Sequence, residues 1–312
     1  MKTSTSWLRT TALMLACAVS MAPAGATGTY AKTKYPLVFA HGMTGFDNIG
    51  PIEYWYGIPG DLRSNGATVY VTQESAFNSS ELRGEQLLAQ VEDILAITGA
   101  GKVNLIGHSH GNQSIRYVAG VRPDLVASAT SVSGPTKGSD VADLIQGVSN
   151  AAGPGLTKLI TSIVNAAGKA IGFLSGDPSL PQDSYAGLQS LSSTGAVAFN
   201  AKFPGGVPTT ACGEGAYSAN GVRYYSWSGI GQFYNPLDPF DYGMAVSALA
   251  FSGKPTDGLV GQCSSHLGQV IRDNYPMNHF HTVNQLLGLV GLGANPVSLY
   301  RIHANRLKTA GL

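Results

Sequence analysis

Short apolar runs and one long amphipathic segment alternate along the first part of the chain. Three runs rich in β-branched or aromatic residues are typical of buried strands: YPLVFAHG (35–42), ATVYVTQ (67–73) and KVNLIGHS (102–109). Residues 79–99 repeat apolar side chains at helical spacing, so we expect a helix capped by Ser79 or Ser80 and ended by Gly99. A further helix begins with QSIRYVAG and ends at Pro123. Strands that alternate with helices predict a mainly parallel sheet of the α/β class.

A second apolar segment, residues 140–175, contains few charged residues. Its apolar residues again recur at helical spacing: Leu156, Leu159, Ile160, Ile163, Val164 and Ala167. Such a segment is either a helix packed into the core or a lid that covers a site in water and exposes its apolar face at an oil surface. Gly153 and Gly155 would supply the hinge of a lid. The pattern alone does not choose between these interpretations.

The first 26 residues have the pattern of a secretory signal peptide. Lys2 and Arg9 precede or flank an apolar run of about 14 residues, and small residues (AGA, 24–26) follow it as a cleavage site. The run is shorter than the roughly 20 residues that a membrane-spanning helix needs. We therefore expect a secreted protein whose mature chain, residues 27–312, forms one domain, since no linker or internal repeat divides it.

The charge of the chain excludes one class of partner. Without Lys2 and Arg9 the chain has 17 basic and 18 acidic residues, and charged residues make up 12% of the whole sequence. The basic residues form no block. We therefore expect no nucleic-acid partner.

Two cysteines, Cys212 and Cys263, remain in the expected mature chain. An even pair in an exported protein predicts a disulfide rather than free or metal-binding thiols. The bridge would close a loop of about 51 residues and would be worth roughly 4 kcal/mol in the chain-entropy model. We expect it to be structural.

The motif GHSHG, residues 107–111, lies between the third predicted strand and its helix and matches the nucleophile elbow G-x-S-x-G. A sharp strand-to-helix turn would expose the hydroxyl of Ser109, and the two glycines would let backbone pass close by. The following helix points its N-terminus at the site, which favours developing negative charge. The strand before and the helix after favour a catalytic serine over an ordinary glycine-rich turn.

A catalytic serine needs a histidine that takes its proton and an acid that orients the histidine, in the chain order serine, acid, histidine. Four histidines follow the motif: His266, His279, His281 and His303. Asp257, on a glycine turn in PTDGLVG, is the favoured acid, and Asp238 and Asp241 compete with it. Either His279 or His281 is the favoured base. The residue types leave these choices open.

An oxyanion hole needs two backbone N–H groups, one directly after the nucleophile and one after an early strand. His110 follows Ser109 directly. The loop HGMTG (41–45) follows the first predicted strand, which makes Met43 the second candidate donor. We expect His41 either to support this loop or simply to end the strand.

Taken together, these residues resemble the secreted true lipases of the Pseudomonas and Burkholderia type. The similarity extends over about residues 29–309 in collinear segments, among them KYPLVFAHGMTGFDNI, VNLIGHSHGNQSIRYVAG, YYSWSG, TDGLVG, DNYPMNH and HANRLK. The resemblance implies an α/β-hydrolase fold with a helical lid at about residues 140–175. It also implies hydrolysis of long-chain triacylglycerol esters at an oil–water interface.

The same resemblance assigns roles to individual residues. It implies Ser109 as nucleophile, Asp257 as orienting acid and His279 as general base. Met43 and His110 match the two oxyanion donors of the family, and Cys212 and Cys263 match its disulfide.

Members of this family carry a structural calcium ion near the catalytic histidine, held by two aspartate side chains and by the backbone carbonyl oxygens of a glutamine and an apolar residue. Asp238, Gln285 and Leu289 match three of these ligands, whereas His281 stands where the second aspartate is expected. Calcium prefers oxygen ligands, so an imidazole is a poor replacement. Three outcomes are open: a lost or weakened site, a site completed by Asp241 or water, and a softer metal such as zinc on His281 and Asp238.

Two other functions are also open. The first is a carboxylesterase or polyester hydrolase that uses the same residues on shorter or soluble esters. The second is a non-catalytic binding protein of the same fold, against which the complete set of catalytic residue types argues. The resemblance further implies a lipase-specific foldase chaperone as folding partner, and we expect the folded chain to be a monomer.

Overall fold

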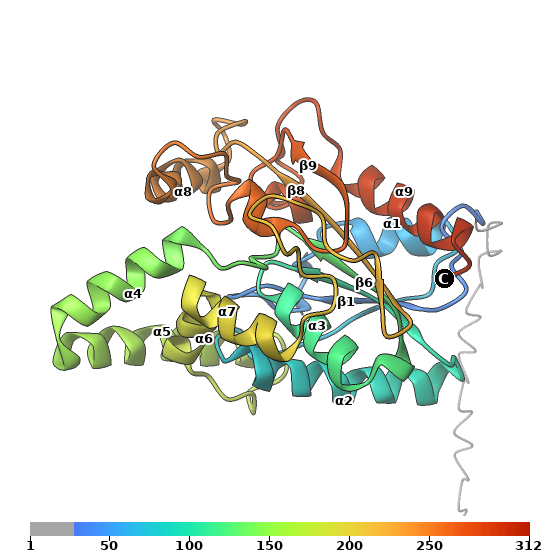
Figure 1. Cartoon of the computed structure of the whole chain (residues 1–312), viewed down its shortest axis with the longest axis horizontal. Helices are drawn as coiled ribbons and strands as arrows, with labels where there is room; N and C mark the ends of the chain where they lie inside the picture. The colour runs from blue at the N-terminus through green and yellow to red at the C-terminus, as the bar shows by residue number, and fades with distance from the viewer. Residues whose placement is uncertain (1–27) are drawn as a thin grey trace, which may run out of the picture.

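The computed structural model describes residues 28–312, so the expected signal peptide lies outside the described residues. A central sheet has the strand order β4-β1-β5-β6-β8-β7, and β9 also pairs with β8 (Figure 1). All pairs are parallel except β7 with β8. The strands are β1 (Leu37–Ala40), β4 (Val69–Val71), β5 (Val103–His108), β6 (Val126–Val132), β7 (Ser218–Ala219), β8 (Val222–Gly229) and β9 (Gln269–Tyr275). A separate hairpin, β2 (Asn48–Ile49) and β3 (Ile52–Glu53), follows β1.

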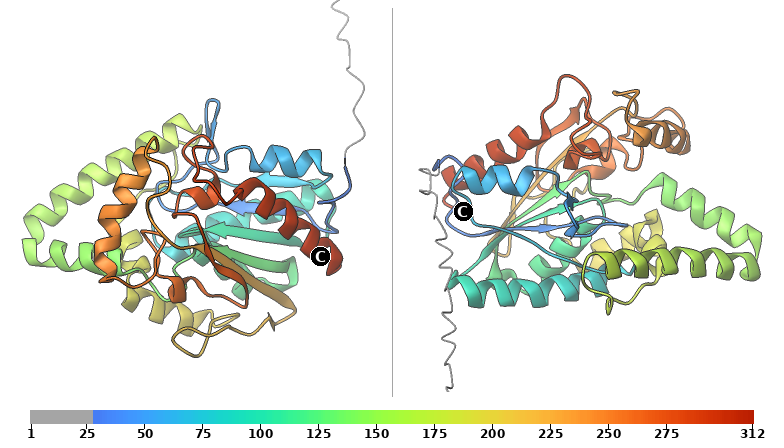
Figure 2. Two further views of the ribbon diagram at one scale, coloured as in Figure 1. Left: turned by 90° about the horizontal axis from the view of Figure 1, so that it is seen from above. Right: turned by 180° about the vertical axis from the view of Figure 1, so that it is seen from behind.

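Helices cover both faces of this sheet (Figures 1 and 2). The helices α1 (Ile58–Ser64) and α9 (Pro296–Thr309) lie together on one face, and α2 (Ser80–Thr98) and α3 (Gly111–Val121) lie on the other. In β1, Leu37 and Phe39 pack with the first pair of helices, whereas Val38 and Ala40 pack with the second. A strand that is buried on both faces has a continuous apolar sequence, which is why this strand was predictable. The α/β class is confirmed.

The two predicted helices of this layer are present. Ser79 caps α2, because its side chain accepts a hydrogen bond from the N–H of Leu82, and Gly99 ends it at a φ of 66°. The helix α3 begins at Gly111, earlier than the expected start at Gln113, because the elbow turn leads directly into the helix. Pro123 follows the end of α3 and opens a short 3-10 helix, Pro123–Leu125.

The segment 140–175 forms two helices, α4 (Asp140–Ala152) and α5 (Pro154–Leu174), which project from the body of the molecule (Figures 1 and 2). They meet at Gly153, whose φ of 83° favours glycine, while Gly155 lies inside α5. Leu159, Ile160 and Ile163 are 48–62% exposed, so the interpretation as a core helix is wrong. Within residues 28–312, no helix is both long enough and apolar enough to cross a membrane.

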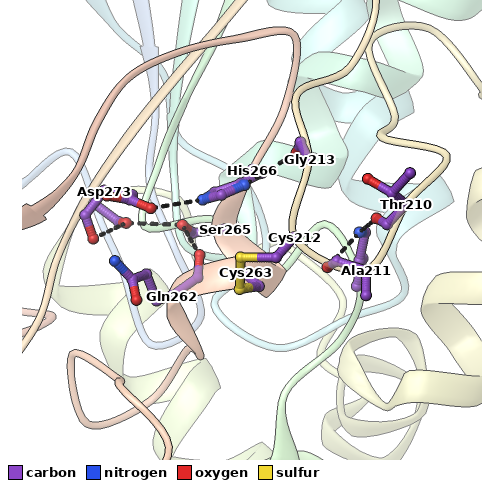
Figure 3. Close-up of a disulfide and its surroundings, with 11 residues drawn as sticks. Thr210, Ala211, Cys212, Gly213, Gln262, Cys263, Ser265, His266 and Asp273 are labelled. Atoms are coloured by element: carbon purple, nitrogen blue, oxygen red, sulfur yellow. Dashed lines mark hydrogen bonds and ion pairs between the residues drawn. A yellow bond between two sulfur atoms is a disulfide. The ribbon is translucent and has the colours of Figure 1, made fainter.

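Cys212 and Cys263 form the predicted disulfide across a sequence separation of 51 residues. It joins the loop before β7 to the 3-10 helix Gln262–Ser265, which follows Asp257 in the chain. Beside it, His266 Nδ1 lies 3.0 Å from the carbonyl oxygen of Gly213 and Nε2 lies 3.0 Å from Asp273 Oδ2 (Figure 3). The remaining elements are α6 (Ser184–Leu191), α7 (Ser193–Lys202), α8 (Pro239–Ser247) and the 3-10 helices Ala248–Phe251 and His281–Val283.

Candidate active site

Ser109 lies at the turn between β5 and α3, with a φ of 52°. Positive φ is unfavourable for a residue with a side chain, so the surroundings must hold the turn. The N–H of Ser109 donates to the carbonyl oxygen of Val132 on β6 at 3.0 Å. A Cβ at Gly107 would lie 2.3 Å from Gly111 O, and a Cβ at Gly111 would lie 2.2 Å from Ala40 O. Close backbone contact therefore requires both glycines of the motif.

Asp257 and His279 form a buried pair beside this turn. His279 Nδ1 lies 2.9 Å from Asp257 Oδ2, and the N–H of His279 donates to the carbonyl oxygen of Asp257 at 2.9 Å. The other carboxylate oxygen, Oδ1, accepts from the N–H groups of Leu259 and Val260 at 3.0 and 2.8 Å. Because a carboxylate oxygen only accepts, Nδ1 of His279 carries the proton and Nε2 is the acceptor.

Ser109 and His279 line the same cavity. Among the described residues no direct hydrogen bond joins the two side chains, and such bonds are often long before substrate binds. Of the candidate histidines, His279 is the one in the wall of this cavity within residues 28–312. The others have different partners: Thr130 for His303, Asp273 for His266, and Asp238 with Asp241 for His281.

One expected oxyanion donor directly follows Ser109 in the chain, and the other belongs to a residue of the cavity wall. Met43 lines the cavity, and His110 precedes the first residue of α3. Within residues 28–312, neither backbone N–H has a hydrogen-bond acceptor. The ring of His110 contacts Ser80 Oγ at 3.0 Å, and burial and the charge of Arg83 lower its pKa well below the ordinary value. Two N–H groups without an acceptor, one directly after Ser109 in the chain and one from a residue of the cavity wall, are suited to stabilise an oxyanion.

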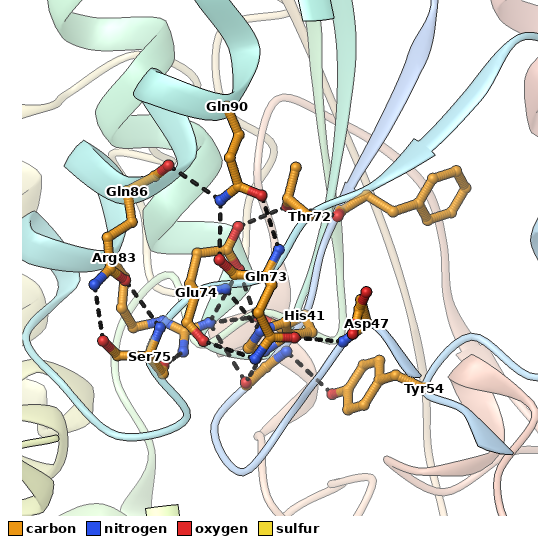
Figure 4. A network of polar contacts seen from close by, with 12 residues as sticks. His41, Asp47, Tyr54, Thr72, Gln73, Glu74, Ser75, Arg83, Gln86 and Gln90 are labelled. Atoms are coloured by element: carbon orange, nitrogen blue, oxygen red, sulfur yellow. Dashed lines mark hydrogen bonds and ion pairs between the residues drawn. The ribbon is translucent and has the colours of Figure 1, made fainter. Parts of the chain in front are cut away.

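A buried polar network holds the loop that carries Met43 (Figure 4). Arg83, on α2, donates from Nη2 to the carbonyl oxygen of His41 at 2.6 Å and from Nη1 to that of Ser75. Glu74 Oε2 lies 3.7 Å from Arg83 Nη2, and the N–H of Glu74 donates to His41 Nε2 at 3.1 Å. Burial raises the pKa of Glu74 to about 7, whereas burial and the charge of Arg83 lower that of His41 to about 3. His41 therefore supports the loop as a neutral ring.

A chain of hydrogen bonds connects this loop to the backbone of His279. The N–H of Gly42 lies 3.1 Å from Tyr54 Oη, Tyr54 Oη lies 2.7 Å from His108 Nδ1, and His108 Nε2 lies 3.1 Å from the carbonyl oxygen of His279. Because a carbonyl oxygen only accepts, His108 Nε2 carries the proton and Nδ1 accepts from Tyr54. Burial lowers the pKa of His108 well below its ordinary value, so the ring is neutral.

The sequence did not predict this role for Tyr54 or His108, nor that of Arg83. Tyr54 lies in the loop after β3, Arg83 in α2 and His108 in β5, and the three share no motif. The one available signal was the position of His108 inside the elbow.

The cavity that contains Ser109 and His279 has a volume of about 220 Å³. Its walls are mainly apolar and come from the oxyanion loop, α4, α6 and the segments around Asp257 and His279, including Met43, Pro135, Val141, Ile145, Leu188, Leu191, Leu259 and Phe280. A second cavity of about 460 Å³, between α4, α5 and α6, shares Met43, Ile145 and Leu188 with the first. Apolar walls with few polar groups are suited to an apolar ligand.

The side chains expected to bind calcium make contacts that differ from those in the calcium site that the resemblance implies. Asp238 and His281 lie together with Asp241, and His281 Nε2 is 3.1 Å from Asp238 Oδ2 and 3.1 Å from Asp241 Oδ1. Gln285 and Leu289 were expected to contribute their backbone carbonyl oxygens, and within residues 28–312 neither oxygen accepts a hydrogen bond, so these two expected ligands are not excluded. Calcium needs about six to eight oxygen ligands, whereas a ring nitrogen contacts both carboxylates here. The ring nitrogen of His281, at the position expected for the second carboxylate, therefore does not fit a calcium ion.

Known proteins resemble this chain over nearly its whole length. A family model described as alpha/beta hydrolase fold matches residues 35–262. A triacylglycerol lipase of Vibrio cholerae is 55% identical over 91% of this chain and 90% of its own length, and a triacylglycerol lipase of Pseudomonas fragi is 43% identical over 90% and 98%. The crystal structure of a metagenomic carboxyl esterase has the same fold, with a TM-score of 0.62, 17% identity and coverage of 88% of this chain and 76% of that one. The chain therefore belongs to the α/β-hydrolase family and, within it, to the bacterial triacylglycerol lipases.

Proposed function

We propose that this chain hydrolyses the ester bonds of long-chain triacylglycerols through an acyl-enzyme on Ser109, with His279 as general base and Asp257 as the acid that orients it. One observation carries this proposal: His279, which is bonded to Asp257, shares an apolar cavity with a serine that is held at positive φ. An ordinary glycine-rich turn would need neither the base nor the cavity.

In the first step, Ser109 Oγ attacks the ester carbonyl carbon and His279 Nε2 takes the hydroxyl proton. The N–H groups of Met43 and His110 stabilise the negative charge on the former carbonyl oxygen, and the N-terminus of α3 adds to this effect. His279 then gives its proton to the departing glycerol oxygen. Water, deprotonated by His279, then attacks the acyl carbon on Ser109; the bond from that carbon to Ser109 Oγ breaks, His279 returns the proton to Oγ, and the fatty acid is released.

The helices α4 and α5 are the lid in this proposal. Ile145 on α4 lines the cavity and is also half exposed, and Leu144 and Val148 beside it are exposed. At an oil surface these side chains leave water, which is favourable by about 25 cal/mol for each Å² of apolar surface removed. Lipid would therefore favour a position of the lid that opens the cavity.

Three further features belong to the same proposal. The pattern of the first 26 residues supports export from the cell, and the resemblance to secreted lipases supports a foldase chaperone and an active monomer. Export is tested by N-terminal sequencing of the secreted chain, which we expect to begin near residue 27. The foldase is tested by refolding with and without the chaperone of a relative, and the monomer by light scattering of the active fraction.

The experiment for the catalytic proposal compares emulsified long-chain triglyceride with a short soluble ester. We expect the wild-type chain to hydrolyse the emulsion and Ser109→Ala to lose activity on both substrates by a factor on the order of 10⁶. Ser64→Ala, an exposed serine on α1, is the matched control and should keep full activity. Near-wild-type rates in folded Ser109→Ala would end the proposal, and cleavage of the soluble ester alone would indicate an esterase.

A further inference from the structure

A fully buried cluster next to the loop that carries His279 consists of Asp238, Asp241 and His281. Asp238 caps α8 and Asp241 lies in its first turn, whereas His281 opens the 3-10 helix that follows His279. The cluster thus joins two segments that are more than forty residues apart in the chain, since His281 and Asp238 are separated by 43 residues.

Protein donors already serve every carboxylate oxygen of this cluster. Asp238 Oδ1 accepts from the N–H of Phe240 at 2.9 Å, and Asp238 Oδ2 accepts from His281 Nε2 at 3.1 Å. Asp241 Oδ2 accepts from the N–H groups of Tyr234 and Asn235 at 2.5 and 2.6 Å. Asp241 Oδ1 accepts from Asn278 Nδ2 at 2.5 Å and lies 3.1 Å from His281 Nε2. The two carboxylates therefore need no cation to satisfy their oxygens.

The proton of His281 follows from its neighbours. Both groups near Nε2 are carboxylates, which only accept, so Nε2 carries the hydrogen and donates it. Nδ1 is buried and has no partner within residues 28–312. A metal on Nε2 would have to displace this hydrogen and break the contact that now joins the two aspartates.

We propose that the ring Nε2–H of His281 replaces the metal ion in this chain. It bridges Asp238 and Asp241 and braces the loop of His279 without calcium. The brace reaches the active site in two steps. The backbone N–H of His281 donates to Asn278 Oδ1 at 2.9 Å, and Asn278, whose Nδ2 is bonded to Asp241, directly precedes His279. Asp241 in turn fixes the backbone at Tyr234 and Asn235. One imidazole thus joins the same two segments that an ion between the carboxylates would join.

The test uses the mature wild-type chain, dialysed against chelator, and measures calcium binding by titration calorimetry and the melting temperature with chelator or with calcium. We expect no calcium binding, the same melting temperature in both buffers and an activity indifferent to chelator. Stoichiometric binding of calcium with a rise in melting temperature would overturn the proposal. Binding of zinc to the same sample would overturn it in favour of a metal site on His281 and the two aspartates.

Two variants of one position sharpen the test. His281→Asp supplies the missing carboxylate, and we expect it to bind calcium and to melt roughly 5–10 °C higher at a hundredfold excess of calcium over Kd than in chelator. Asn is almost the same size as Asp but has no carboxylate charge. His281→Asn should therefore bind no calcium, and its melting temperature should lie below that of the wild-type chain by the same amount in both buffers. A folded His281→Asp protein that ignores calcium, or a His281→Asn protein with an unchanged melting temperature, would contradict the proposal. These readouts do not require hydrolysis, so they are independent of the proposed catalytic roles.

Discussion

The floor and the cover of the apolar cavity are held in different ways. The floor comprises the elbow around Ser109, the oxyanion loop (41–45) and the loop of His279, and many of its buried polar groups have specific partners. The carboxylate of Asp257 accepts from three donors, and Arg83 donates to three carbonyl oxygens. The cover comprises α4 and α5, in which Leu144, Val148 and Ile163 are 56–62% exposed.

This difference separates the part of the site that is held in a fixed geometry from the part that can move. Buried hydrogen bonds have one favourable geometry, and an unpaired buried group costs about 1–3 kcal/mol, so the floor has a single arrangement. Apolar contacts are non-directional and depend mainly on the area removed from water, so the cover can be moved by a change of solvent. We therefore expect substitutions in the floor to change rate or stability in water, and substitutions in the cover to act only at a lipid surface.

After Ser109→Ala, the largest effect should come from Asp257→Asn, with a loss of about 10⁴ in kcat. The N–H groups of Leu259 and Val260 would hold the amide oxygen of the new side chain, which turns its NH₂ group toward His279 Nδ1. Nδ1 would then have to accept, and the proton would move to Nε2, where it prevents removal of the Ser109 proton. Steady-state kinetics on a soluble ester measure the loss. Asp273→Asn, in the His266 pair beside the disulfide, is the control and should leave kcat unchanged; equal losses in both variants would refute the explanation.

The next largest effect concerns the pH dependence of stability. Glu74 keeps its proton in the folded state up to a pKa of about 7, against an ordinary value of 4.5, so its contribution to stability falls as pH rises between these values. His41 has a folded pKa of about 3 against 6.5, so its contribution falls as pH decreases through that range. Between about pH 4.5 and 6.5 the two slopes oppose each other.

Glu74→Gln removes one of these slopes. In this variant, acidification from pH 6.5 to 4.5 should lower the free energy of unfolding. The decrease should exceed that of the wild-type chain by up to about 1.4 kcal/mol per pH unit. Urea unfolding at several pH values measures this slope. Glu81→Gln, at a partly exposed residue paired with Lys202, should leave the slope as it is. Parallel pH curves for wild type and Glu74→Gln would show that the buried pair does not titrate in this way.

A smaller effect is expected from Tyr54→Phe. The substitution leaves the N–H of Gly42 and Nδ1 of His108 without their partner, which should cost about 1–3 kcal/mol of stability and lower kcat more than it changes KM. Chemical unfolding and kinetics on one soluble ester provide both readouts. Tyr242→Phe removes an exposed hydroxyl that contacts Pro236 and should change neither. Wild-type stability and kcat in Tyr54→Phe would show that this chain of hydrogen bonds does not stabilise the floor.

The smallest effect in water should come from the cover. Leu159→Ser combined with Ile163→Ser changes two exposed side chains, so the free energy of unfolding should stay within about 0.5 kcal/mol per site and the rate on a soluble ester should be unchanged. The rate on emulsified triglyceride should fall severalfold, because less apolar surface enters the oil. Val197→Ser, 70% exposed on α7, is the control. An equal loss on soluble and emulsified esters would argue that α5 has no special role at the interface.

The sequence predicted those features that depend on near neighbours. The bounds of α2 followed from its periodicity and from the conformations that Ser79 and Gly99 favour, and the elbow followed from two glycines for which no other residue leaves enough space. The disulfide followed from the even number of cysteines in a chain expected to be exported. In each case the physical cause lies within a few residues or in a simple count.

Only the tertiary structure decided which distant groups meet. The residue types alone left three aspartates and two histidines open, and the fold bonds Asp257 to His279 while it places His281 between Asp238 and Asp241. Helical periodicity identified an apolar face on residues 140–175 but not what covers it, because a core helix and an exposed helix have the same period. Tyr54, Arg83 and His108 likewise act through partners on other elements. The sequence by itself thus determined the local conformations, whereas the pairing of polar groups depended on contacts that form only when the sheet brings its strand ends together.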